Sequence, residues 1–131
     1  MIRRIFKNKF IYVVLLTVIF IFTTGCNRPN YKTISASEAI KELEKDDSIV
    51  LLDVRDYEEH QEERIPNSVL IPLNELKYEV TDKIKDKETR IFIYCHSGRR
   101  SREAARTLSR LGYKNVYNIG GIINWEYELE R

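Results

Sequence analysis

Apolar and polar residues alternate along this chain in blocks that predict strands and helices in turn. Two mostly apolar runs, residues 48–54 and 91–94, are typical of strands buried on both faces of a parallel sheet. Other segments repeat apolar residues at helical spacing, as Ala104, Leu108 and Leu111 do. Strands are predicted over 48–54, 69–72, 91–94 and 115–119, and helices over 36–45, 56–63, 73–83 and 101–111, with a closing helix that holds Trp125. This alternation predicts a three-layer α/β fold with a mostly parallel sheet.

The first 26 residues follow a different pattern. Residues 1–9 contain four bases and no acid, and the mostly apolar run of 10–22 leads to Thr23-Thr24-Gly25-Cys26. A basic start, a short apolar run and a small-residue junction are typical of a secretion signal. Thirteen residues of helix rise only about 20 Å, against the roughly 30 Å of a bilayer's hydrocarbon core, so a spanning helix is the weaker interpretation.

The junction before Cys26 resembles the lipobox of bacterial lipoproteins. Gly25 and Cys26 fit that motif, although two threonines stand where a lipobox usually has leucine and then alanine or serine. The resemblance implies a signal peptide over 1–25 and a lipidated Cys26 at the start of a short tether over 26–32. It places the domain of residues 33–131 on the outer face of the bacterial cytoplasmic membrane. An uncleaved signal anchor is the alternative.

Removal of the signal would change the charge of the protein. Residues 1–26 contain four Lys or Arg and no acid, so their loss turns the formal net charge from +2 to −2. A slightly acidic domain gives no reason to expect nucleic acid as a partner. With Cys26 lipidated, Cys95 is the one remaining thiol, and together with His60 and His96 it offers no metal-ligand spacing. We therefore expect neither a disulfide nor a metal.

The heptapeptide Cys95-His96-Ser97-Gly98-Arg99-Arg100-Ser101 carries the candidate chemistry. It follows a predicted buried strand and leads into a predicted helix, the position where functional groups gather in parallel sheets. Gly98 permits a turn in which backbone N–H groups face inward and, with the helix N-terminus, form an anion site. Such surroundings lower the pKa of a cysteine from about 8.5 to roughly 3.5–7.5. The loop therefore predicts an anion held beside a thiolate of Cys95.

Four motifs in this chain resemble the rhodanese (thiosulfate sulfurtransferase) family in its single-domain form. The loop is similar to the family's Cys-x-x-Gly-x-Arg-Ser. The other three motifs are Asp53-Val54-Arg55, the stretch 65–72, and the segment from Gly112 through Gly120-Gly121-Ile122 to Trp125. The chain departs from the family at Glu63-Arg64, which replaces Gly-His, and at Asn67-Ser68, which replaces Gly-Ala. The resemblance implies an α/β/α fold over 33–131 with about five strands.

The resemblance also implies an activity and roles for particular residues. The domain would move a sulfane sulfur from a small anionic donor such as thiosulfate to a thiol or protein acceptor, through a persulfide on Cys95 and without a cofactor. Arg100 would hold the donor's oxyanions, and Asp53 and Arg55 would pair to support the site. The candidate substrate-binding residues are His96, Ser97, Gly98, Arg99, Arg100 and Ser101.

Two other functions, and other roles for the two histidines, are possible interpretations of the same residues. A phosphatase or arsenate reductase of the Cys-x5-Arg kind needs an arginine six positions after the cysteine, where Ser101 stands. A sulfur carrier or protein-interaction module with little turnover would have the same sequence features and remains an open alternative. His96 is not needed as a base if the thiol is ionised. His60, in a charged helix, is expected to be solvated.

Overall fold

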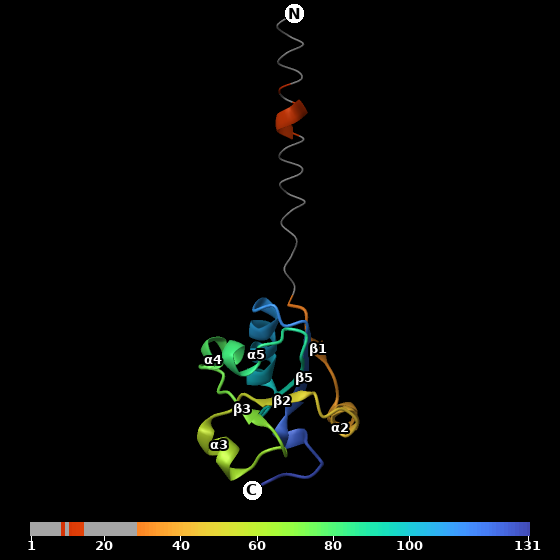
Figure 1. The fold of residues 1–131 in the computed structure, drawn as a ribbon, viewed down its shortest axis with the longest axis vertical. Coiled ribbons are helices and arrows are strands. Elements are labelled where there is room, and N and C mark those ends of the chain that lie inside the picture. The colour runs from red at the N-terminus through yellow and green to blue at the C-terminus, as the bar shows by residue number, and fades with distance from the viewer. Residues whose placement is uncertain (1–8, 10, 15–28) are drawn as a thin grey trace, which may run out of the picture.

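The computed structural model describes residues 9, 11–14 and 29–131 (Figure 1). The few described residues before position 29 are helical. Within the described part of the chain, no helix has both the length and the apolar character needed to cross a bilayer. Cys26 and most of the predicted signal peptide lie outside the described residues, so cleavage and lipidation stay predictions.

A parallel sheet of five strands runs through the middle of the domain. Its spatial order is β1-β5-β4-β2-β3, and all neighbouring strands are parallel. The strands are β1 (Lys32–Thr33), β2 (Val50–Asp53), β3 (Val69–Leu70), β4 (Arg90–Cys95) and β5 (Asn115–Gly121). This sheet confirms the predicted α/β class and the expected five strands. The sequence pattern does not predict β1, because two exposed polar residues carry no hydrophobic signal.

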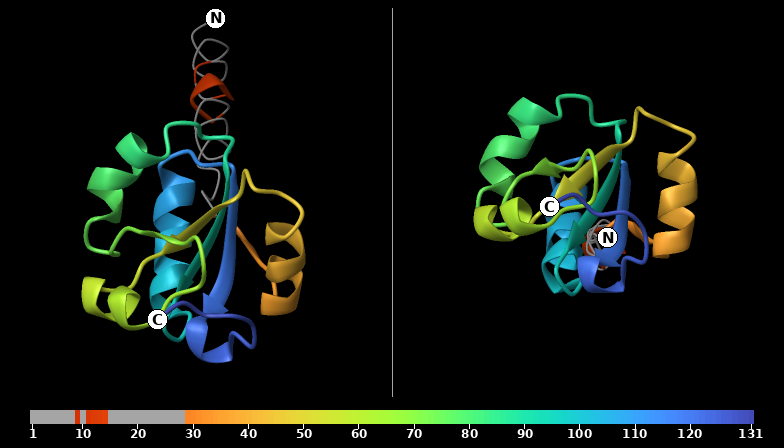
Figure 2. Two further views of the ribbon diagram at one scale, coloured as in Figure 1. Left: turned by 60° about the horizontal axis from the view of Figure 1, so that its bottom comes forward. Right: turned by 90° about the horizontal axis from the view of Figure 1, so that it is seen from below.

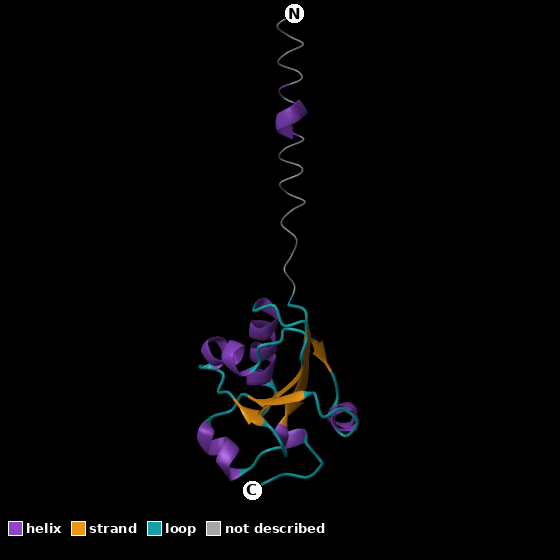
Figure 3. Cartoon of the chain, viewed as in Figure 1, coloured by secondary structure: helices purple, strands orange, loops and turns teal. Residues whose placement is uncertain are grey.

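Helices cover both faces of the sheet and so form the three predicted layers (Figure 2). They are α2 (Ala36–Leu43), α3 (Tyr57–Glu62), α4 (Leu76–Lys83) and α5 (Arg99–Arg110). The helices α4 and α5 pack on one face and α2 packs on the other, as Figure 3 also shows. These four helices confirm the predicted ones, with bounds that differ by three residues or fewer.

The predicted closing helix is wrong. After β5 the chain makes only a short 3₁₀ turn, η1 (Ile122–Asn124), and Trp125 follows it in an extended conformation. The Trp125 amide donates to the Ile122 carbonyl, three residues back, so the turn ends before an α-helical hydrogen bond forms. The Trp125 side chain is buried on the sheet face that α2 covers, which confirms its predicted place in the core.

The two sides of β4 explain its continuous apolar run. Ile91, Ile93 and Cys95 belong to the core layer under α4 and α5, whereas Phe92 and Tyr94 belong to the layer on the other face. None of the five is more than 1% exposed. A central strand buried on both faces therefore holds its last residue, Cys95, in a fixed position.

The helix α5 separates the Cys95 loop, at its N-terminus, from the point where the chain enters the domain, at its C-terminus. It begins at Arg99, just after the C-terminus of β4, and ends at Arg110. In its last turn, Ser109 Oγ accepts a hydrogen bond from the Asn30 amide at 2.6 Å. A helix of twelve residues is about 18 Å long. The chain therefore enters the domain at the end of α5 opposite the loop that follows Cys95.

Candidate active site

The thiol of Cys95 lies in the tight loop that connects β4 to α5. Its Sγ accepts a hydrogen bond from the Gly98 amide at 3.0 Å. Gly98 is the N-cap of α5 and has a φ of +97°, a left-handed conformation that glycine adopts without steric cost. The helix therefore begins two residues before the predicted start at 101, and it places the amides of its first turn close to the sulfur.

The loop also depends on a glycine at the end of β5. Gly121 pairs with Cys95 in the sheet register. A Cβ on Gly121 would lie 2.3 Å from the His96 carbonyl oxygen and 2.7 Å from Ser97 Cα. Only glycine allows β5 to approach the loop this closely. The Ile123 amide then donates to the His96 carbonyl at 3.3 Å and fixes the loop from the same side.

Ser101 closes the loop from the helix side, and its side chain is buried. Its hydroxyl lies 3.6 Å from Cys95 Sγ and donates to Asn118 Oδ1 at 2.7 Å. The same Oδ1 accepts the Gly120 amide at 3.2 Å, so Asn118 is itself held in place. In this arrangement the hydroxyl accepts from the Cys95 thiol, and rotation of its one proton from Asn118 to the sulfur would let it donate to a thiolate.

The loop favours the ionised form of Cys95. Burial alone raises the pKa of this thiol, because a buried charge is poorly solvated. Hydrogen bonds from the Ser101 amide and hydroxyl, and from the amides of Gly98 and Ser97, lower it by more. The pKa of Cys95 therefore lies below its ordinary value, as the sequence predicts.

Arg100 lies in the first turn of α5 and binds an acid of α3. Its Nη1 and Nη2 donate to the two carboxylate oxygens of Glu59 at 2.7 and 2.8 Å, and Nη1 lies 3.5 Å from Asp56 Oδ2. The hydrogen bonds from Arg100 lower the pKa of Glu59 to about 2. Arg100 therefore joins α5 to α3, while the role expected for it in holding the donor's oxyanions stays a prediction.

A second polar cluster lies next to the loop, where Asp53 pairs with Tyr94 in the sheet register. Asp53 Oδ2 accepts hydrogen bonds from Arg55 Nη2 at 2.8 Å and from the Tyr94 hydroxyl at 2.9 Å. His60 Nδ1 lies 2.9 Å from the same oxygen. These contacts confirm the predicted pairing of Asp53 with Arg55. The expectation that His60 is solvated is wrong, because α3 turns its ring inward onto Asp53 and leaves it 9% exposed.

The charges of this cluster are balanced within it. Burial raises the pKa of Asp53, but the hydrogen bonds from Arg55 and His60 lower it by more, so it lies below its ordinary value. Burial, and then the Asp53 charge, raise the pKa of Tyr94 to about 12. The Tyr94 hydroxyl also accepts the Ile65 amide at 3.2 Å. The cluster therefore ties β2, β4 and α3 into a rigid support beside Cys95.

A cleft of about 240 Å³ opens beside the loop. It is lined by His96, Ile122 and Ile123, by Arg55, and by three glutamates of the 59–63 segment. Ser97 and Arg99 are also exposed. Across the described residues, no three His, Cys, Asp or Glu side chains are placed to share a metal ion.

The structure brings the predicted loop residues into one turn around Cys95, and it adds residues that the sequence does not single out. Glu59 carries a recognisable signal, because Asp56 and Glu59 have the spacing of a capping box. Asn118 and Tyr94 carry none, since their partners are distant in sequence. The close approach at Gly121 also needs the sheet register.

Comparison with known proteins establishes the family. A family model described as a rhodanese-like domain matches residues 35–128. The chain belongs to the rhodanese family. A solved structure of a rhodanese with anions from E. coli aligns with this rhodanese domain at a TM-score of 0.60 and 32% identity, covering 63% of this chain and 98% of that one.

Two bacterial relatives bear names that describe sulfur chemistry. Thiosulfate sulfurtransferase GlpE of Coxiella burnetii is 39% identical over 97 residues, which are 73% of this chain and 88% of GlpE. The Bacillus subtilis protein named "Putative sulfur carrier protein YrkF" is 41% identical over 95 residues, 71% of this chain. The match spans only 50% of YrkF. These relatives place the domain among the rhodanese-type sulfurtransferases as a class.

Proposed function

We propose that this rhodanese domain moves a sulfane sulfur from a thiosulfate-like donor to a thiol acceptor through a persulfide on Cys95. The observation that carries the proposal is the Cys95 thiol at the start of α5, where amides and one hydroxyl lower its pKa. A thiolate is the nucleophile that such a transfer requires. The name of GlpE and the anions in the E. coli structure support an anionic sulfur donor.

The proposed reaction has two displacement steps. The Cys95 thiolate attacks the outer sulfur of thiosulfate, the S–S bond breaks, and its electron pair leaves with sulfite. This step forms a Cys95 persulfide anion. An acceptor thiolate then attacks the outer persulfide sulfur, and a new S–S bond joins that sulfur to the acceptor. The bond between the outer sulfur and Cys95 Sγ breaks, and its electron pair returns to Sγ as the thiolate. The amides of Ser97, Gly98 and Ser101 stabilise the negative sulfur in both resting forms.

Mass spectrometry of a fragment spanning residues 29–131 tests this proposal. GlpE matches this chain over 88% of its own length, so the fragment contains a complete domain. Treatment with thiosulfate should add the mass of one sulfur atom, and a reductant should remove it. Cys95→Ser should show no gain. The proposal fails if the wild-type fragment gains no sulfur or if Cys95→Ser gains as much.

A sulfur carrier is the second candidate function, because the name of the Bacillus relative describes one. A carrier and an enzyme both load sulfur, but they differ in how often they release it. With thiosulfate and a small thiol in excess, an enzyme should release many equivalents of sulfite per Cys95. A carrier should release about one equivalent and then stop until its partner protein is added.

We also propose that a lipid on Cys26 tethers the domain to the outer face of the bacterial cytoplasmic membrane. The contact between Asn30 and Ser109 supports an orientation for such a tether. Because the chain enters at the end of α5 opposite the loop, Cys95 would face away from the bilayer. Cys26→Ala should abolish metabolic labelling with a fatty acid, and unchanged labelling would refute the lipid anchor.

A further inference from the structure

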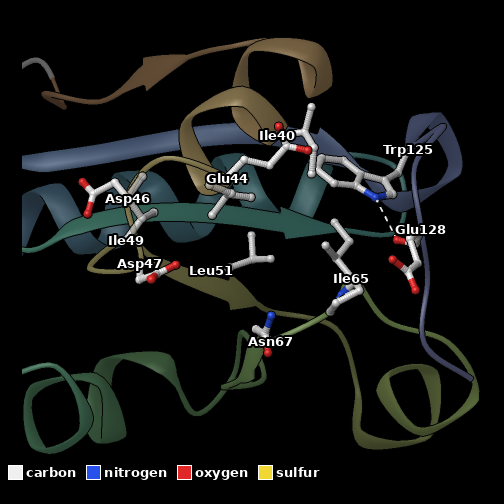
Figure 4. A pocket seen from close by; sticks show the side chains of 12 residues that line it. Ile40, Glu44, Asp46, Asp47, Ile49, Leu51, Ile65, Asn67, Trp125 and Glu128 are labelled. Atoms are coloured by element: carbon white, nitrogen blue, oxygen red, sulfur yellow. Dashed lines mark hydrogen bonds between the residues drawn. The ribbon is translucent and has the colours of Figure 1, made fainter.

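A groove of about 520 Å³ lies on the sheet face that α2 covers, away from α4 and α5 (Figure 4). We call it the α2 groove. It exists because α2 packs over β5 and leaves the β2 side of this face without a helix. The floor of the groove is apolar and consists of Ile40, Ile49, Leu51, Ile65 and Trp125. Its volume falls within the range of about 300–1,000 Å³ that is usual for ligand sites.

The rim of the α2 groove is acidic. Asp46 and Asp47 lie at one end, Glu128 lies at the other, and the Glu44 side chain extends between them along the α2 side towards Ile40 and Trp125 (Figure 4). No lysine, arginine or histidine lines the groove. Asp46 is already bound by Arg90 and by Ser48. Among the described residues, the carboxylates of Glu44, Asp47 and Glu128 have no hydrogen-bond or ion-pair partner. The groove therefore presents three uncompensated negative charges around an apolar floor.

We propose that the α2 groove binds a basic, apolar segment of a protein partner. Aliphatic side chains of that segment would cover the floor beside Trp125, and lysine or arginine side chains would reach the rim. Acids at both ends of the floor suit an extended polypeptide with bases on either side of an apolar stretch better than a compact ligand with one cation. Such an arrangement pairs opposite charges across the contact, which is a source of specificity.

The position of the α2 groove relative to the Cys95 loop indicates what the partner does. This step of the inference rests on the proposed function. The turn of residues 122–125 separates the groove from the cleft beside the Cys95 loop, because Trp125 lines the groove while Ile122 and Ile123 line the cleft. The same turn contacts the loop through the Ile123 amide and the His96 carbonyl. A segment in the groove therefore contacts the turn that also contacts the Cys95 loop. We assign the partner as the protein that accepts sulfur from the Cys95 persulfide.

Trp125 makes the binding directly measurable, because it is the only tryptophan of the chain. The probe is a ten-residue peptide of alternating lysine and isoleucine, added to the 29–131 fragment while tryptophan fluorescence is recorded. A saturable change is expected with this peptide. Matched peptides with glutamate in place of lysine, or with serine in place of isoleucine, should cause no saturable change. Equal responses to all three peptides would overturn the proposal.

Charge reversal shows whether the rim carries the binding. The double variant Glu44→Lys with Asp47→Lys should bind the lysine–isoleucine peptide with an affinity about tenfold lower, or lower still. The matched control, Asp82→Lys with Glu103→Lys, makes the same change in net charge on α4 and α5 and should leave the affinity unchanged. If both variants bind the peptide equally weakly, net charge alone explains the effect and the proposal is overturned.

The oligomeric state is a further check. If the wild type dimerises and Glu44→Lys with Asp47→Lys is monomeric, the groove binds a second copy of this chain, and the proposal is again overturned.

A transfer assay separates this proposal from the proposed function. Both charge variants should form the Cys95 persulfide as the wild type does. Transfer to a cysteine-bearing lysine–isoleucine peptide should fall about tenfold in Glu44→Lys with Asp47→Lys, while transfer to cysteine itself should not change. If no persulfide forms but the peptide still binds as expected, the sulfur-transfer function fails and the groove remains a binding site. If transfer to the peptide is equal in all variants, the assignment of the partner as acceptor fails.

Discussion

Two anionic centres lie at the carboxyl ends of the neighbouring strands β2 and β4, Asp53 on the first and Cys95 on the second, and different groups stabilise them. The Asp53 carboxylate is bound mainly by the side chains of Arg55, Tyr94 and His60, together with the backbone amide of Arg55 at 2.9 Å. The Cys95 sulfur is bound mainly by backbone amides and by one hydroxyl. A carboxylate that is paired with charged and polar side chains is suited to holding secondary-structure elements together. Oriented backbone amides stabilise the charge of a thiolate and leave it a free lone pair with which to attack. The contrast distinguishes the support of the site from its reactive centre.

Removal of the Asp53 carboxylate should have the largest effect on stability. Asp53→Ala leaves the buried Arg55 guanidinium without its partner, and loss of one member of a buried pair costs about 3–5 kcal/mol. The free energy of unfolding, measured with urea, should fall by that amount. Asp82→Ala, at an exposed position of α4, is the control and should change it little. A small loss in Asp53→Ala would mean that the cluster does not hold the elements together.

A methyl group at Gly121 should act on the loop instead. Gly121→Ala places a Cβ against the His96 carbonyl and Ser97, and overpacking of this kind costs about 1–3 kcal/mol. Because the strain falls on the Cys95 loop, the alkylation rate of Cys95 near neutral pH should fall as well. Gly112→Ala is the control, since a Cβ there meets no atom within 4 Å and Gly112, whose φ is +92°, lies at the far end of α5, so it should leave the reactivity of Cys95 unchanged. Equal thiol reactivity in Gly121→Ala and the wild type would contradict this prediction.

Of the three changes, loss of the ion pair between Arg100 and Glu59 should lower the free energy of unfolding least. Its side chains are 26% and 30% exposed, so we expect about 1 kcal/mol or less. The pKa of Glu59 is lowered from 4.5 to about 2, so its contribution is present above pH 4.5 and is lost as the pH falls towards 2. Glu59→Gln should therefore be less stable than the wild type near neutral pH, and this difference should shrink in acid. A difference that does not depend on pH would exclude the pair as its source.

The Cys95 loop could largely be predicted from the sequence, whereas the contacts of the Asp53 cluster could not. The strand β4 was predictable because burial on both faces requires apolar residues at consecutive positions, and this run is visible in the sequence from Ile91 to Tyr94. The turn at Gly98 was predictable because few residues other than glycine adopt its positive φ. His60 was misjudged because its charged neighbours suggest an exposed helix, whereas its burial depends on Asp53 seven residues earlier. Local patterns thus located the reactive loop, but its support depends on contacts between distant segments.

The end of the chain shows the same limit. A helix around Trp125 was expected from the short segment after Gly121, yet the structure has only a 3₁₀ turn there. The Trp125 side chain is drawn into the core on the α2 face, and this tertiary packing decides the backbone conformation. The α2 groove was also out of reach of the sequence, because its floor combines residues from α2, β2, the 65–67 turn and the C-terminal segment.

The pH dependence of Cys95 alkylation tests the central claim most directly. In the 29–131 fragment Cys95 is the only cysteine, so the rate with iodoacetamide reports its ionisation alone. We predict that the rate rises with a midpoint below the roughly 8.5 of an unperturbed cysteine, and that Ser101→Ala moves this midpoint upward. A midpoint at or above that of an unperturbed cysteine would contradict the claim that the loop holds Cys95 as a thiolate.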